Sequence, residues 1–158
     1  LVIGTPTLNL AVILCTFLLA AGAGSAASAR LRRVQRLRAC LLLLVPVLFA
    51  LVWGLERLHA STAGWSTVAR SLGVAAVVAP AAFLMGIPFP VGVRLLAPEW
   101  RTFIPWFWGL NGVASVLGSA LVVASVLQLG FHVATLLPAA AYLLAAAASA
   151  RLGALTRA

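Results

Sequence analysis

Few side chains in this sequence could serve as an acid, a base or a metal ligand. Glu56 and Glu99 are the only acidic residues, aspartate is absent, and the two histidines are His59 and His132. General acid–base catalysis needs titratable groups within hydrogen-bond reach, and a metal site needs several ligands at defined spacing. Each histidine lies in a connection without a second ligand or base nearby. The sequence therefore predicts no catalytic residue, no cofactor and no metal site.

The two cysteines, Cys15 and Cys40, lie within or at the edge of apolar stretches. A disulfide framework or a thiolate metal site requires more cysteines at defined spacing. We therefore predict that both are small apolar residues of the core.

A glycine-rich stretch around Gly22, Gly24 and Ser25 imitates the phosphate-binding loop of a dinucleotide fold. A true fingerprint follows a strand and has an acidic residue about 20 positions later. Here the next residues bring five arginines and no acid. The favoured interpretation is packing between membrane helices, because small residues four apart allow two helices to approach closely.

A second polar and small-residue pattern occupies the segment 104–127. Asn111, Ser115 and Ser119 are spaced by four, so they share one helix face, and Gly112 and Gly118 lie beside it. Polar groups at membrane depth face neighbouring helices or a cavity. We favour interhelical hydrogen bonding along this seam. The alternative is a polar lining for a substrate path.

The stretch from 86 to 108 is the third candidate. Gly86, Pro88 and Pro90 are expected to interrupt a helix, because proline lacks a backbone donor and clashes with the preceding turn. Broken helices can form ion or substrate sites in transporters. The favoured interpretation is an interfacial turn in which Glu99 pairs locally with an arginine, because charges at membrane interfaces usually set topology.

Composition decides the environment in which these residues act. Hydrophobic residues make up 64% of the 158 positions and charged residues only 8%, which excludes a soluble globular domain and a disordered chain. Spanning a bilayer takes about 20 mostly apolar residues. The sequence predicts an all-α transmembrane bundle of about five spans, the third of them broken, at 9–28, 39–55, 72–87, 104–127 and 131–150.

The arginines predict an orientation for the bundle. Nine of the eleven basic residues lie on one side, and only Arg57 and Arg70 on the other; the nine are Arg30, Arg32, Arg33, Arg36, Arg38, Arg94, Arg101, Arg151 and Arg157. The positive-inside rule places the loop 30–38 and the C-terminus in the cytoplasm. We expect a multi-pass protein of a bacterial cytoplasmic membrane. The net charge of +9 is not taken as a nucleic-acid signal, because no wet basic face accompanies it.

Two strings resemble a known family. Residues 83–94 (FLMGIPFPVGVR) and 104–119 (IPWFWGLNGVASVLGS) are similar to the C-terminal membrane module of bacterial spermidine synthase-like membrane proteins. Gly4, Thr5 and Pro6, the stretch 17–25, and Gly130 with Phe131 also resemble that module. The resemblance implies a preceding soluble, aminopropyltransferase-like domain that binds S-adenosylmethionine. None of that domain's site residues is present in this sequence.

Two functions follow as hypotheses. The leading one is a non-catalytic membrane module that anchors or assembles a soluble domain or a larger membrane complex, with the lipid bilayer and other protein subunits as partners. The chain is expected to be a piece of a longer polypeptide or a small subunit. The alternative is a transporter-like conduit that uses the broken third helix and the polar face of the fourth.

Overall fold

The computed structural model describes residues 6–31, 33–62, 64–96 and 98–155, and of these 92% are helical and none forms a strand. A helix satisfies its backbone donors and acceptors internally, as an apolar environment requires. The all-α prediction is therefore confirmed. Arg32, Arg157, Gly4 and Thr5, which entered the predictions above, lie outside the described residues.

Five helical segments in the described part of the chain are long and apolar enough to cross a membrane: Pro6–Arg30, Val34–Ser61, Thr67–Arg94, Pro98–Leu129 and Phe131–Arg151. The first comprises α1 (Pro6–Ala27) and the short η1 (Ser28–Arg30), and the second is α2 (Val34–Ser61). Helix α2 runs without interruption through Pro46 and extends beyond the predicted apolar stretch 39–55 at both ends.

The third span is broken as predicted. Helix α3 (Thr67–Met85) ends before Gly86, and α4 (Pro88–Arg94) begins with Pro88 at its first turn, where the missing N–H of proline costs nothing. At the start of α3, the Ser66 hydroxyl accepts a hydrogen bond from the Ala69 amide. Pro80 inside α3 does not interrupt that helix.

The last two spans contain short additional elements. The turn η2 (Pro98–Phe103) precedes α5 (Ile104–Leu129), which ends at Gly130 with φ of 83°, a conformation that favours glycine. The fifth span consists of the four-residue α6 (Phe131–Ala134) and α7 (Leu136–Leu155).

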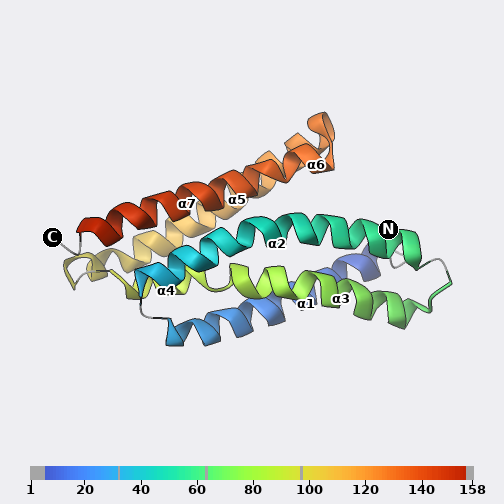
Figure 1. Ribbon diagram of the computed structural model, residues 1–158, viewed down its shortest axis with the longest axis horizontal. Helices are drawn as coiled ribbons and strands as arrows, with labels where there is room; N and C mark the ends of the chain where they lie inside the picture. Colours follow the sequence, from blue (N-terminus) through green and yellow to red (C-terminus); the bar gives the residue numbers. More distant parts are fainter. Residues whose placement is uncertain (1–5, 32, 63, 97, 156–158) are drawn as a thin grey trace.

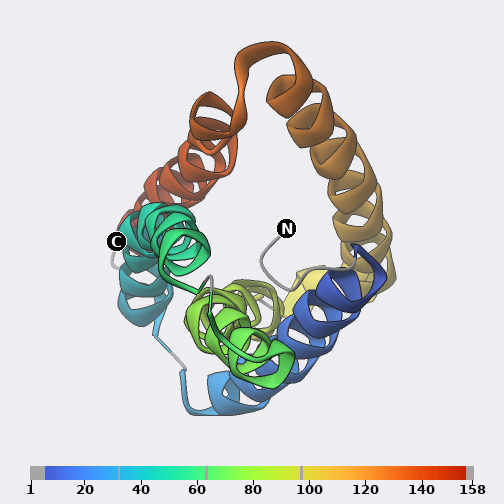
Figure 2. The same cartoon turned by 90° about the vertical axis from the view of Figure 1, so that its right-hand side faces the viewer.

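The helices run roughly along one direction, and their ends gather at the two ends of the molecule (Figure 1). Helix α3 packs against α1 and α2, and α2 also packs against α7. The view along the helices places α5 apart from α2 and α7, on the other side of the bundle (Figure 2). No residue of α5 is buried.

Two small clusters form the described core. One surrounds Val74 and Val78 of α3, where Leu51, Leu55 and Leu58 of α2 and Val12 and Ile13 of α1 pack. The other joins Cys40 of α2 to Ile87 and Val91 near the break. Leu44, between them on α2, is completely buried. The buried apolar residues thus lie on α2–α4, α6 and α7 and at Ile87, whereas α1 packs against them through partly buried residues and α5 contributes nothing buried.

Candidate functional site

The glycine-rich stretch of α1 lies where α1 crosses the end of α3. A Cβ atom on Gly24 would lie 2.9 Å from the carbonyl carbon of Phe83 and closer still to its oxygen. A Cβ on Gly86 would collide in the same way with the Ala21 carbonyl, 2.8 Å from its carbon. Each glycine therefore lets its helix approach the backbone of the other. Gly22 has no atom within 4 Å of its Cβ position, so it takes no part in this contact.

The break between α3 and α4 is closed by backbone hydrogen bonds and by α1. The Gly86 amide donates to the Ala82 carbonyl at 3.1 Å, and the Ile87 amide donates to Leu84 at 3.2 Å. Pro88 and Pro90 have no amide proton to satisfy. The Cys40 thiol of α2 donates to the Leu84 carbonyl at 3.7 Å. The break thus serves here as a packing contact in which the amides of Gly86 and Ile87, just before the prolines, already have partners.

The polar face of α5 is the least covered of the predicted sites. Asn111, Gly112, Ser115 and Ser119 are exposed and Gly118 is half-buried, and a Cβ on either glycine would meet nothing within 4 Å. The hydroxyls donate within their own helix, from Ser115 to the Asn111 carbonyl and from Ser119 to the Val116 carbonyl, both at 2.8 Å. Helix α5 contacts mainly η2 and α6 at its two ends, and Trp108 packs edge-on against Phe89 of α4.

Arginines dominate one end of the bundle. Seven exposed arginines of the described chain lie there: Arg30, Arg33, Arg36, Arg38, Arg94, Arg101 and Arg151. Arg94 donates to the hydroxyl of the fully buried Ser28, which in turn donates to the Ser25 carbonyl. The prediction that Glu99 pairs with a nearby arginine is wrong, because no arginine within the described ranges lies within salt-bridge distance of Glu99. Glu99 instead lies exposed in η2.

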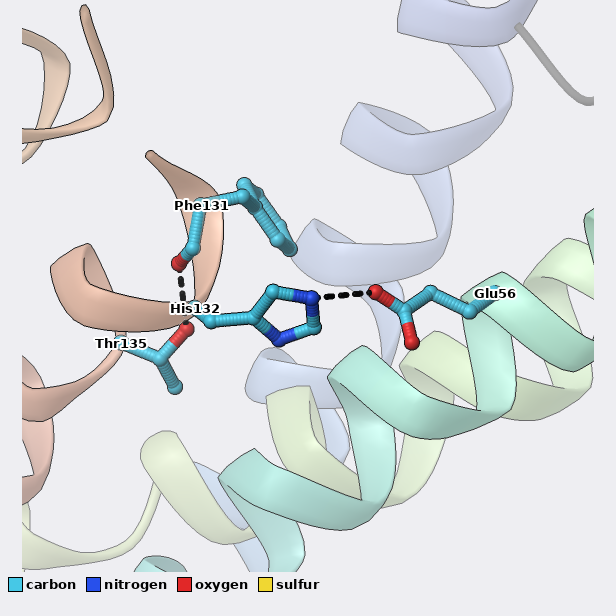
Figure 3. Close-up of polar contacts among 4 residues, drawn as sticks. All are labelled: Glu56, Phe131, His132 and Thr135. Carbon is cyan, nitrogen blue, oxygen red and sulfur yellow. Dashed lines mark hydrogen bonds and ion pairs between the residues drawn. The ribbon is translucent and has the colours of Figure 1, made fainter. Parts of the chain in front are cut away.

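Sequence reasoning missed a contact between a histidine and a glutamate at the opposite end (Figure 3). The Nε2 atom of His132 in α6 lies 3.0 Å from the Oε1 atom of Glu56 in α2. The prediction that His132 has no second ligand or base nearby is wrong, because the Glu56 carboxylate lies beside it. The two residues are 76 positions apart, so no local pattern could have paired them. Both side chains are at least half exposed, which suits a contact between helix ends better than a buried catalytic pair.

The two cysteines differ in burial. Cys40 is buried, as predicted, whereas Cys15 of α1 is exposed on the bundle surface. The prediction that Cys15 belongs to the core is therefore wrong. Its position on the outside of a membrane helix accounts for the apolar sequence around it, because lipid is as apolar as a core.

Comparisons with protein families, with curated proteins and with solved structures found no match for this chain.

Proposed function

We propose that this chain is a non-catalytic membrane module whose helix α5 binds another transmembrane helix and so assembles a larger complex. The observation that carries the proposal is the exposure of α5. This helix is long and apolar enough to span a bilayer, yet it buries no residue against the rest of the described chain.

The composition of α5 supports a protein neighbour in addition to lipid. Its 26 residues make a helix about 39 Å long, so a hydrocarbon layer of about 30 Å centred on it encloses Asn111. The Asn111 side chain makes no hydrogen bond to the described residues. An amide left without a partner in an apolar medium costs several kcal/mol. A neighbouring helix would supply that partner, and Gly112 and Gly118 would allow it to approach closely.

The test is the assembly state of the protein extracted from native membranes in a mild detergent. Gly118→Leu and Asn111→Leu should each release partner subunits, measured by light scattering after gel filtration. Gly22→Leu is the matched control, because it also adds an isobutyl group to a helical glycine with nothing within 4 Å of its Cβ position. Equal assembly of all three variants and the parent chain would refute the proposal.

A conduit has weaker support from the same observations. The break near Gly86 is closed against α1, and the hydroxyls of Ser115 and Ser119 already donate within α5. The proposals still separate in one experiment, because a conduit predicts that Asn111→Leu abolishes flux in liposomes. An assembly helix predicts that flux does not depend on Asn111.

The resemblance noted above extends the proposal to a partner. A soluble, spermidine synthase-like domain attached to this module would dock at its arginine-rich end, which we propose to be cytoplasmic. Attachment of a membrane-impermeant thiol reagent to Ser61→Cys in a Cys15→Ser, Cys40→Ser background, tested in intact cells, would check the orientation. If the reagent labels this variant only after the membrane is opened, the arginine-rich end is not cytoplasmic. Mass spectrometry of the native protein would show whether such a domain belongs to the same polypeptide.

A further inference from the structure

Arginine side chains of two elements reach the end of the first span, which itself ends in an arginine. Arg30 closes η1, Arg36 lies in the first turn of α2, and Arg94 ends α4. Arg94 donates to Ser28 of η1, and the Arg36 guanidinium makes a long contact of 3.5 Å with the Arg30 carbonyl. The segment Ser28–Arg30 therefore holds two guanidinium groups beside a third arginine.

The guanidinium groups of Arg36 and Arg94 are held in place by neutral acceptors. The acceptors are a serine hydroxyl and a backbone carbonyl near the end of a helix, and such carbonyls carry only a partial negative charge. None of the three arginines has a carboxylate within 4.0 Å among the described residues, and the contact between Glu56 and His132 lies at the opposite end of the bundle. Like charges gathered without an acid repel one another. An added anion would relieve that repulsion.

The surroundings indicate which anion this is. Trp100 lies in η2 and Trp106 in the first turn of α5, at the same end as the three arginines (Figure 1). Tryptophan rings prefer the headgroup level of a bilayer, so the arginines lie at the depth of lipid phosphates. An arginine has five N–H donors in a planar fork, and Arg94 uses one of them on Ser28. The others suit the oxygens of a phosphodiester.

We propose that Arg30, Arg36 and Arg94 form a binding site for the headgroup of an anionic phospholipid. Ser28 is a positioning residue of this site, because its hydroxyl fixes Arg94 and is itself fixed by the Ser25 carbonyl. The site is independent of the assembly surface on α5, since the two share no residue.

The experiment measures lipid binding to the purified full chain by native mass spectrometry. Phosphatidylglycerol and phosphatidylcholine are titrated separately, and we expect the anionic lipid to bind more tightly. The double variant Arg36→Gln, Arg94→Gln should weaken phosphatidylglycerol binding by about 25-fold, from about fivefold per arginine near a membrane surface. The matched control is Arg101→Gln, Arg151→Gln, which removes the same charge from the same end of the bundle. Its effect should stay below about threefold.

Three results would overturn the proposal. They are equal affinity for the two lipids, equal loss in the two double variants, and complete displacement of the lipid by millimolar inorganic phosphate, which would mark a site for a soluble anion. Ser28→Ala keeps every charge, and it should still weaken binding severalfold because Arg94 loses its anchor. If the arginine variant does not fold, Ser28→Ala decides alone, and unchanged affinity in it refutes the site.

Discussion

The crossing of α1 and α3 gives the sharpest test of how this bundle holds together. Replacing Gly24 with alanine adds one methyl group at 2.9 Å from the Phe83 carbonyl carbon, where ordinary contact begins at 3.4 Å. The two backbones would have to separate by at least about 0.5 Å, and further to clear the oxygen. Because the obstacle is backbone, no side chain can rotate away.

The expected cost follows from two opposing terms. Overpacking costs about 1–3 kcal/mol, and the upper end applies because the obstacle cannot move independently. Alanine regains up to about 1 kcal/mol of helix propensity inside α1. Gly24→Ala should therefore lower the free energy of unfolding by about 2 kcal/mol. Gly86 lies beyond the last residue of α3, so Gly86→Ala should cost about 3 kcal/mol without that compensation.

The assay is reversible unfolding in mixed micelles by sodium dodecyl sulfate, followed by circular dichroism. Gly22→Ala is the control, since nothing lies within 4 Å of its Cβ position, and it should be neutral or slightly stabilising. The double variant Gly24→Ala, Gly86→Ala should cost much less than the sum of the single variants, because one separation accommodates both methyl groups. If Gly24→Ala is as stable as Gly22→Ala, the close crossing does not exist.

Three further predictions concern the rest of the bundle and use the same unfolding assay. Leu44→Ala, at a fully buried position, should cost about 1–2 kcal/mol, which is below the range of about 2–5 kcal/mol for core leucines of soluble proteins, because lipid offers the unfolded helix an equally apolar surrounding. Leu144→Ala, at a position 71% exposed, should cost almost nothing. Glu56→Gln and His132→Ala should each cost less than about 1 kcal/mol, and together no more than either alone, because they remove the same exposed pair; additive losses would contradict the contact. Ser66→Ala removes the cap on the Ala69 amide and should cost about 1 kcal/mol, whereas Ser66→Asp should retain stability.

Local features of the sequence were enough to predict the helices and the break. Long apolar stretches require helices in lipid, and Pro88 and Pro90 interrupt one because their chemistry acts on the nearest turn. The contact between Glu56 and His132 could not be predicted in this way, because it depends on how α6 lies over the end of α2. The exposure of Cys15 could not be predicted either, because a lipid-facing position and a core position favour the same small apolar residue.

The comparison of α1 with α5 shows what small residues in a membrane helix do and do not specify. Both helices combine glycine with serine at spacings that place them on one face. In α1 this face packs against α3, and Gly24 lies against the backbone of Phe83. In α5 no equivalent contact exists within the described chain, and Gly112 and Gly118 have open space beside them. A face of small residues therefore allows another helix to approach closely, but it does not specify which one. That choice depends on the loops that connect the helices. Because α1 already has its neighbour, substitution at Gly24 should destabilise the bundle, whereas substitution at Gly118 should leave its stability unchanged and release a partner.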